Sequence, residues 1–275
     1  MKKKAVFISD LDGTLLKSDG TVSRRNLQLF HSLEKRVIRV IATGRSISSF
    51  RGVIDKNFPI DYLIFSCGAG VLDFKTDEIL VKNIIPYYKI ENLVKFLMEM
   101  KIGFALQKEI PKNHKLYYFR GDNHSEDFDR RLSIYRSVST EIFDEIPREN
   151  FTQAIVIIDS FSEMKQLSSL IGERFPEFSI VWSTSPLNHN STWIEIFPKS
   201  VSKSGGVKRL LELKEIDKIP IIGVGNDYND LDFLKFADKG YMVENGPEDL
   251  KGEFEVVPSF ENDGVYFAAK RSNLI

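Results

Sequence analysis

The sequence predicts an α/β protein: a core built on a parallel sheet, with a second, smaller α+β domain inserted into it. Two observations lead to this prediction. Short apolar runs alternate with amphipathic stretches over the first third of the 275 residues, and the same alternation returns from residue 202 onward. Between them, paired strand patterns mix with helical ones, which is typical of an antiparallel sheet with helices on one face. We therefore expect a core of residues 1–83 and 189–275 and an inserted domain of residues 84–188.

The first third of the chain alternates strands and helices. Residues 4–9 form an apolar run that suits a buried strand, and Leu27, Phe30 and Leu33 recur at the spacing of one helix face. Such alternation favours parallel strands joined by right-handed crossovers. In chain order we expect strand 4–9, helix 24–35, strand 37–42, helix 46–54 and strand 62–65.

The pattern changes near residue 70 and changes back near residue 202. A turn at residues 75–77 between two apolar segments predicts a β-hairpin. The middle of the chain then reads as helix 87–101, strands 103–109 and 115–120, helix 126–136, strand 151–159, helix 162–175 and strands 178–184 and 192–197. The first pattern resumes with helix 202–213, strand 219–225, a helix from Asn229, strand 240–244 and a short helix from Pro247.

Composition excludes several classes of protein. Lys and Arg total 38 against 39 Asp and Glu, so the net charge of −1 argues against a general attraction to nucleic acid or to an anionic membrane. The single cysteine, Cys67, excludes an internal disulfide and a multi-cysteine zinc site. The apolar runs are shorter than the ~7–15 residues of a signal peptide or the ~20 of a membrane span. We therefore expect a cytoplasmic protein that binds neither nucleic acid nor membrane, as a monomer or small homo-oligomer.

The strongest chemical signal is a pair of carboxylates, Asp10 and Asp12, directly after the first predicted strand. Ligands of open α/β sheets bind beyond the carboxyl ends of the strands, and Gly13 permits a turn there. A carboxylate is a nucleophile toward phosphorus, and a neighbouring carboxyl group can protonate the leaving oxygen and later activate water. Because like charges repel, such a pair favours a bound cation or a shared proton. Two surface aspartates in a solvated turn are the structural alternative.

Three further segments place polar groups at predicted strand ends or helix starts. Thr43 follows the second strand, and its hydroxyl and a Gly-flanked amide suit either a phosphate oxygen or the cap of the next helix. Lys203 opens a helix, where its ammonium is either exposed or offsets nearby negative charge. The segment 225–230 (GNDYND) carries oxygen-rich side chains that suit either Mg²⁺ or a turn that caps the next helix.

These four segments, in this order, resemble the motifs of the haloacid dehalogenase-like phosphatases. DLDGTLL (10–16) resembles the first motif, and an insertion between the second and third motifs matches the subgroup with a type II cap. ATGR (42–45) and ENDGV (261–265) are similar to the Cof-type branch of the IIB group. The resemblance covers essentially the whole chain. It implies a Rossmann-like core, Mg²⁺ dependence and hydrolysis of small phosphate esters, often sugar phosphates, with the cap setting substrate choice.

The resemblance also implies a role for each matching residue. Asp10 would be the nucleophile that forms an aspartyl-phosphate, Asp12 the general acid and base, and Lys203 a counter-charge. Contacts to the phosphoryl group and the substrate would come from Leu11, Thr43, Gly44, Arg45 and Asn229. Mg²⁺ would bind among Asp10, the carbonyl oxygen of Asp12, Asn226, Asp227 and Asp230.

Two departures from the family pattern matter. The usual fourth motif is GDxxND, and Asn226 stands where its first Asp binds the metal, so we expect weaker Mg²⁺ binding with Asp227 supplying a carboxylate. The usual NGA after the third strand is here Cys67-Gly68-Ala69, and we interpret Cys67 as a buried structural thiol. Several basic residues of the cap either line a cleft or face solvent, and we expect them to face solvent: His114, Lys115, Arg120, Arg130 and Arg131.

Three functions stay open at this point. The first is a Mg²⁺-dependent phosphatase that acts on a small phosphorylated metabolite. The second is a phosphomutase of the same fold, which transfers the phosphoryl group and releases no inorganic phosphate. The third is a catalytically weak sensor or binding protein, suggested by Asn226. Asp12 argues against a dehalogenase, because a halide leaving group needs no acid.

Overall fold

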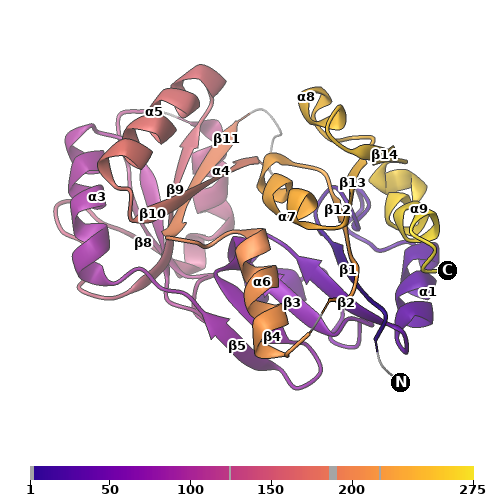
Figure 1. The fold of residues 1–275 in the computed structure, drawn as a ribbon. Coiled ribbons are helices and arrows are strands. Elements are labelled where there is room, and N and C mark those ends of the chain that lie inside the picture. The colour runs from indigo at the N-terminus through magenta and orange to yellow at the C-terminus, as the bar shows by residue number, and fades with distance from the viewer. Residues whose placement is uncertain (1–2, 124, 186–190, 217) are drawn as a thin grey trace. The chain divides into compact units, whose positions relative to one another are not determined.

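The chain forms two compact units, each built around its own sheet (Figure 1). The computed structural model describes residues 3–123, 125–185, 191–216 and 218–275. The first unit joins two segments of the chain, Met1–Val81 and Ser202–Ile275, and the second is Lys82–Val201. No helix in the described part of the chain is long and apolar enough to cross a membrane.

The first unit contains an eight-stranded sheet with the order β14-β13-β12-β1-β2-β3-β4-β5. Its strands are β1 (Ala5–Ser9), β2 (Val37–Ala42), β3 (Tyr62–Phe65), β4 (Gly70–Asp73), β5 (Glu78–Lys82), β12 (Ile221–Gly225), β13 (Lys239–Val243) and β14 (Glu255–Val257). The strands from β14 to β3 are parallel, and β4 turns back antiparallel to β3. The carboxyl ends of β12, β1, β2 and β3 therefore meet at one edge of the sheet.

Helices of the first unit cover both faces of this sheet. They are α1 (Arg24–Leu33), α2 (Ile47–Arg51), α6 (Lys203–Leu213), α7 (Leu231–Phe236), α8 (Glu248–Lys251) and α9 (Gly264–Arg271). On one face, Val6 and Ile8 of β1 share an apolar cluster with residues of α6 and α7. On the other, the ring of Phe7 lies 6.1 Å from the ring of Phe30 in α1, measured between centroids. Because both faces are covered, β1 is apolar at almost every position and buried throughout.

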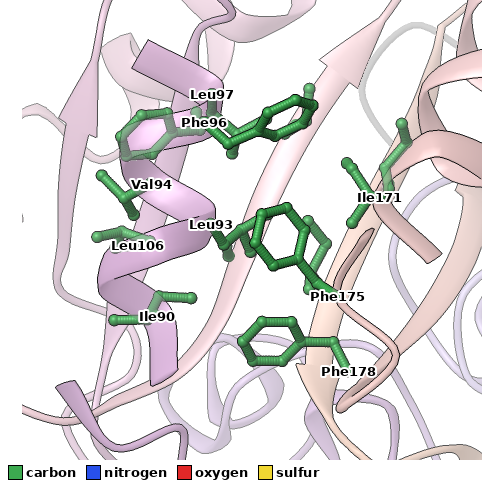
Figure 2. Packing of buried hydrophobic residues seen from close by; sticks show 14 of the residues in the cluster. Ile90, Leu93, Val94, Phe96, Leu97, Leu106, Ile171, Phe175 and Phe178 are labelled. Carbon is green, nitrogen blue, oxygen red and sulfur yellow. The ribbon is translucent and has the colours of Figure 1, made fainter. Parts of the chain in front are cut away.

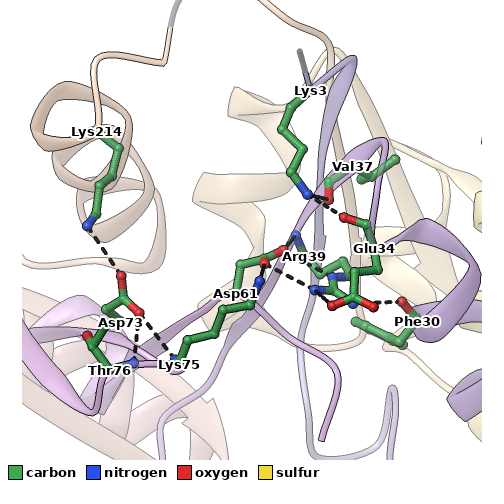
Figure 3. A network of polar contacts seen from close by, with 10 residues as sticks. All are labelled: Lys3, Phe30, Glu34, Val37, Arg39, Asp61, Asp73, Lys75, Thr76 and Lys214. Atoms are coloured by element: carbon green, nitrogen blue, oxygen red, sulfur yellow. Dashed lines mark hydrogen bonds and ion pairs between the residues drawn. The ribbon is translucent and has the colours of Figure 1, made fainter. Parts of the chain in front are cut away.

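Arg39 is the charged exception in the buried strand β2. Its guanidinium donates to both carboxylate oxygens of Asp61, each at 3.0 Å, and to the carbonyl of Phe30 at 3.1 Å. The Nζ atom of Lys75 lies 3.0 Å from the Oδ1 atom of Asp61. Figure 3 shows this network, in which Asp61 directly precedes β3. The buried charge of Arg39 is therefore fully paired at the amino end of that strand.

The second unit contains a six-stranded sheet with the order β10-β11-β9-β6-β7-β8. Its strands are β6 (Phe104–Lys108), β7 (Leu116–Phe119), β8 (Ser139–Glu141), β9 (Phe151–Ile158), β10 (Phe178–Thr184) and β11 (Thr192–Pro198). Neighbouring strands are antiparallel, except that β7 and β8 run parallel. The helices of this unit are α3 (Tyr87–Glu99), α4 (Glu126–Ile134) and α5 (Phe161–Arg174).

Helices cover both faces of the second sheet, whereas the sequence pattern suggested one face. Helices α3 and α5 pack on one face, in an apolar cluster that includes Leu93, Leu106 and Ile171 (Figure 2). On the other face, Phe128 and Leu132 of α4 share a second cluster with one residue of β6 and two alternate residues of β9. Successive side chains of a strand point to opposite faces, and β9 is buried at every position. Both of its faces therefore need a cover.

Arg131 of α4 is buried, so the expectation that it faces solvent is wrong. Its guanidinium carbon lies 4.5 Å from the ring centroid of Trp193 and 5.0 Å from that of Tyr135. Asp127, one turn earlier, accepts hydrogen bonds from the indole N–H of Trp193 at 2.6 Å and the hydroxyl of Ser191 at 2.8 Å. The remaining basic residues of that group are exposed or half-buried: Lys115, Arg120, Arg130 and His114.

The second border between the two units lies later in the chain than we expected. A border at residues 188 and 189 assigns β11 to the core, but β11 pairs with β9 and β10 of the second sheet. The second unit accordingly extends to Val201. The apolar pattern of this strand predicts that it is buried, but it carries no sign of which sheet it joins.

Candidate active site

Three neighbouring parallel strands bring the predicted site residues to one edge of the first sheet. The last residue of β1, Ser9, is paired with Ile41 of β2 on one side and Val224 of β12 on the other. Asp10 follows β1 directly, Thr43 follows β2, and the fourth motif follows β12. Segments far apart in the sequence therefore end side by side, at the edge where ligands of such sheets bind.

The chain turns sharply after Asp10. The carbonyl of Leu11 accepts hydrogen bonds from three amides of the turn, two of them at 2.9 Å and one at 3.4 Å. Gly13 has a φ of 71°, and a Cβ atom there would lie only 2.7 Å from the side-chain nitrogen of Asn226. Glycine is therefore required at this position for its backbone conformation and for space. The side chain of Leu11 is fully buried, so its expected substrate contact can come only from its backbone.

A buried ammonium joins two carboxylates at the centre of this edge. Lys203, the first residue of α6, is 1% exposed, and its Nζ atom donates to Oδ1 of Asp10 at 2.7 Å and to Oδ1 of Asp230 at 2.5 Å. The second oxygen of Asp230 accepts from the backbone amides of Asn226 at 2.8 Å and Asp227 at 3.0 Å. One positive charge thus faces two negative charges in a place nearly closed to water.

This imbalance shifts the pKa values of the cluster. Burial, and after it the charge of Asp230, raise the pKa of Asp10 to about 7, although Lys203 acts in the opposite direction. Burial also disfavours the charged form of Lys203, but the two carboxylates outweigh it and raise the pKa of Lys203 well above its usual value. Lys203 is therefore a permanent cation, whereas the negative charge of Asp10 is incompletely offset.

Asp12 does not join this cluster, and it pairs with Arg45 instead. The guanidinium donates from Nε to Oδ2 of Asp12 at 2.8 Å and from Nη2 to Oδ1 at 2.7 Å. Its Nη1 atom donates to the hydroxyl of Ser49 at 3.1 Å and to the carbonyl of that residue at 3.3 Å. The side chain of Asp12 is 37% exposed, so its carboxylate lies at the open side of the site.

Thr43 is fully buried, and hydrogen bonds to both its backbone amide and its carbonyl fix its position. Its amide donates to the carbonyl of Ile64 in β3 at 2.9 Å, and its carbonyl accepts from the amide of Cys67 at 3.0 Å. Its Oγ1 atom accepts from the amide of Arg45 at 3.1 Å. Because the oxygen acts as an acceptor here, the hydroxyl hydrogen is the group that Thr43 offers to an anion. Gly44, the next residue, is exposed.

The fourth motif forms a short helical turn, η3 (Tyr228–Asp230), rather than an open loop. The carboxylate of Asp227 accepts from the next amide at 2.8 Å and forms a capping box with the last residue of the turn. The side-chain oxygen of Asn226 accepts from the hydroxyl of Thr14 at 3.0 Å. Asn229 lies half-buried within the turn. The motif therefore does cap a turn, which was the structural alternative, while it also holds Lys203.

The start of α6 lies against a turn that follows β3, η1 (Ser66–Gly68). Gly68 has a φ of 94°, and a Cβ atom there would lie 2.0 Å from the carbonyl oxygen of Ser202. Cys67 has a φ of 51° and is fully buried. The absence of a side chain at Gly68 lets the helix approach closely, and the position of its first residue, Lys203, follows from that approach.

Sequence reasoning missed two side chains that hold this edge together. The side chain of Asn245 donates to the carbonyl of Gly13 at 2.8 Å and accepts from the amide of Phe260 at 3.1 Å. The carboxylate of Asp232 accepts from the amide of Ser204 at 2.8 Å in the first turn of α6. Asn245 follows a strand of the parallel sheet, and that position is a signal that sequence analysis could have used. Asp232 lies inside a predicted helix and carries no such signal.

The donors at this edge suit a hard divalent cation. Carboxylate, carbonyl and amide oxygens come from Asp10, Asp12 and Asn226, and such oxygens are the ligands that Mg²⁺ prefers. The incompletely offset charge of Asp10 favours a cation beside it. Within the described ranges, no three His, Cys, Asp or Glu side chains cluster as a metal site. Backbone or amide oxygens would therefore have to complete the ligand set.

Comparison with known proteins identifies relatives along the whole chain. A family model described as haloacid dehalogenase-like hydrolase matches residues 7–268. A protein of Haemophilus influenzae named "Putative phosphatase" is 28% identical over 271 residues, which cover 96% of this chain and 95% of the relative. A Bacillus subtilis protein named 5-amino-6-(5-phospho-D-ribitylamino)uracil phosphatase YwtE is 23% identical over 281 residues, which cover 94% of each chain.

Solved structures share the fold. A phosphatase of the HAD superfamily from Bacteroides thetaiotaomicron matches with a TM-score of 0.79 and 21% identity, covering 99% of this chain and 96% of that one. A HAD subclass IIB sugar phosphatase matches with a TM-score of 0.77 and 19% identity, covering 99% and 100%. These likenesses confirm the predicted α/β architecture, a parallel-sheet core with a cap domain.

Proposed function

Because the chain belongs to the haloacid dehalogenase-like hydrolase family, as its motifs predicted, we propose that it is a Mg²⁺-dependent phosphatase of small phosphorylated metabolites, sugar phosphates in particular. The observation that carries the proposal is the buried contact of Lys203 with Asp10 and Asp230 at the carboxyl edge of a parallel sheet. A relative named as a phosphatase and the fold shared with a subclass IIB sugar phosphatase support this reaction and this substrate class.

Asp10 is the nucleophile in this proposal. One of its oxygens attacks the phosphorus of the ester, which forms an aspartyl-phosphate and breaks the bond to the leaving-group oxygen. A carboxylate that approaches a phosphate dianion meets repulsion of several kcal/mol at ~4 Å and an effective dielectric of ~20. The ammonium of Lys203, already 2.7 Å from Asp10, offsets that repulsion without having to move.

Asp12 transfers the protons. In its protonated form, Asp12 keeps one oxygen as an acceptor for Arg45, and the O–H of the other gives a proton to the leaving oxygen as the bond to phosphorus breaks. Its carboxylate then takes a proton from the water that cleaves the aspartyl-phosphate. Its partial exposure leaves room for a leaving group and for that water. The hydroxyl of Thr43 and the amide of Gly44 hold the phosphoryl oxygens during both steps.

The metal would be held by the carboxylate of Asp10, the carbonyl of Asp12 and the side-chain oxygen of Asn226. When bound, Mg²⁺ supplies positive charge that offsets the charge on the nucleophile and on the phosphoryl group. We assign Asp230 a different role from the metal ligand that the motif suggested. Both of its oxygens already accept hydrogen bonds, from Lys203 and from two backbone amides, so Asp230 positions the ammonium.

We assign substrate choice to the second unit, Lys82–Val201. The site residues of the first unit are suited to the phosphoryl group, which all phosphate monoesters share, and they offer little to tell one leaving group from another. In this proposal, exchanging residues of the second unit changes the preferred ester and leaves the identity of the nucleophile unchanged.

Phosphate release from p-nitrophenyl phosphate and a panel of sugar phosphates tests the proposal, with Mg²⁺ and with EDTA. We expect turnover that requires the metal, and a loss of about 10³-fold or more in Asp10→Asn. Release of inorganic phosphate distinguishes a phosphatase from a phosphomutase. Turnover that survives in Asp10→Asn, or that EDTA leaves unchanged, would contradict the proposed mechanism.

A further inference from the structure

We propose that Ser49 is a positioning residue for the general acid and base, Asp12, and that it acts through Arg45. The inference rests on the proposed function. The motif resemblance gave Arg45 a substrate contact and gave Ser49 no role. In the structure, the guanidinium of Arg45 lies between the two side chains and donates to both.

Different donors of Arg45 contact Asp12 and Ser49. Nε and Nη2 form a two-pronged pair with the carboxylate of Asp12, at 2.8 and 2.7 Å. Nη1 donates to the hydroxyl and the carbonyl oxygen of Ser49. Because the guanidinium is planar, contacts on two sides fix its orientation. The two-pronged pair then fixes the orientation of the Asp12 carboxylate as well.

The start of α2 explains why Ser49 lies where it does. Ser46 caps this helix, and its hydroxyl accepts from the amide of Ser49 at 3.2 Å. The helix therefore begins at Ile47, two residues after Arg45, and its first turn brings Ser49 back toward Arg45. Ser48, its neighbour on the same turn, is exposed.

Such a support matters because Asp12 lies at the open side of the site. Proton transfer requires the carboxyl group within hydrogen-bond reach of the leaving oxygen. The side chains of Asp12 and Arg45 are 37% and 28% exposed, so packing alone holds neither of them. Without Ser49, the long side chain of Arg45 gains rotamer freedom, and the carboxylate of Asp12 gains it as well.

The test compares two substitutions of nearly equal shape. Ser49→Thr keeps the hydroxyl, whereas Ser49→Val replaces it by a methyl group. Ser48→Val introduces the same β-branched side chain at the exposed neighbour and controls for the effect on the helix. For each variant, kcat/KM is measured with an alkyl phosphate, whose leaving oxygen needs a proton, and with p-nitrophenyl phosphate, whose leaving group needs little help.

We expect Ser49→Val to lower kcat/KM about tenfold for the alkyl phosphate and less than about threefold for p-nitrophenyl phosphate, because only the first depends on a well-placed acid. Ser49→Thr and Ser48→Val should behave like the wild type with both esters. An equal fall with both esters, or a Thr variant as impaired as the Val variant, would show a merely structural role and overturn the inference.

A second measurement needs no substrate. Thermal unfolding of Ser49→Val, Asp12→Asn and the double variant should be non-additive by about 2 °C, although Ser49 and Asp12 share only Arg45 between them. Additive shifts would refute the link through Arg45. If the wild type hydrolyses neither ester, the proposed function fails, and this cycle still decides the role of Ser49.

Discussion

Two buried cations of the first unit, Arg39 and Lys203, differ in how the carboxylates around them are balanced. Two anionic side chains offset the charge of Arg39: Asp61 holds its guanidinium with two contacts, and the Oε1 atom of Glu34 lies 3.7 Å from it (Figure 3). Lys203 is as deeply buried, but it faces two carboxylates, Asp10 and Asp230, that one ammonium cannot neutralise.

The pKa values record this difference. Burial opposes ionisation of Asp61, yet the hydrogen bonds from Arg39 outweigh burial and hold the pKa of Asp61 below its usual 3.8. At the other network, burial and Asp230 raise the pKa of Asp10 to about 7. In the Arg39 network the hydrogen bonds favour the ionised carboxylate, whereas in the Lys203 cluster two carboxylates share one ammonium. The raised pKa of Asp10, at the carboxyl edge of a parallel sheet, marks the Lys203 cluster as the candidate site.

The largest expected effect contrasts one substitution in each network. Asp61→Asn leaves the buried guanidinium of Arg39 short of charge, and breaking such a pair costs about 3–5 kcal/mol of stability. Asp10→Asn removes a carboxylate whose ionised form the fold disfavours, so in EDTA at neutral pH we expect no loss of stability. Urea unfolding measures both free energies. Equal destabilisation by the two substitutions would remove the distinction between the networks.

Lowering the pH should reduce the loss of stability that Asp61→Asn causes. The folded-state pKa of Asp61 is lower than its unfolded value of 3.8. The stability that its ionised form contributes is therefore present above pH 3.8 and is lost as the pH falls through the folded-state pKa. The difference in unfolding free energy between the wild type and Asp61→Asn should be full at neutral pH and smaller at about pH 3.5. A difference that does not change with pH would mean that packing, and not charge, stabilises this network.

The smallest expected effect concerns the proposed Mg²⁺ site beside the Lys203 cluster. Asn226→Asp adds a carboxylate where the side-chain oxygen is neutral, and we expect Mg²⁺ to bind about tenfold more tightly, about 1.4 kcal/mol. Asn57→Asp makes the same charge change on an exposed turn before β3 and should leave the affinity unchanged. Isothermal titration with Mg²⁺ alone provides the measurement. Equal affinities of all three proteins would place the metal away from Asn226.

Most of the fold could be predicted from the sequence because its signals are local. The apolar runs of β1 and β2, separated by an amphipathic helix, predict parallel strands wherever the chain goes next. Two elements near the end escaped prediction, β14 and α9. Strand β14 has three residues, too few for a periodic pattern. Helix α9 follows Asp263, whose backbone is left-handed and whose side chain does not cap the helix, so the sequence carries no signal for the start of α9. The second border failed for a different reason, because strand pairing is a long-range property.

The candidate site divides in the same way. Asp10 and Thr43 could be placed at one sheet edge because each follows a predicted strand. The partners of Asp12 and Asp230 could not be predicted. The pairing of Asp12 with Arg45 depends on side-chain rotamers, and the two hydrogen bonds that Asp230 accepts from backbone amides depend on the path of the turn η3. The identity of the site residues can therefore be predicted from the sequence, but the role of each one requires the structure.

The turn η1 shows how unevenly a site constrains its own sequence. Cys67 and Gly68 are neighbours and both have positive φ values. At residue 67 the positive φ favours asparagine or glycine, and full burial limits the size and polarity of the side chain. At residue 68 the carbonyl of Ser202 fills the space of any side chain, and nothing larger than a hydrogen fits. Substitution at this turn is therefore limited on one side of a peptide bond and blocked outright on the other, by a contact that carries no charge and takes no part in the chemistry.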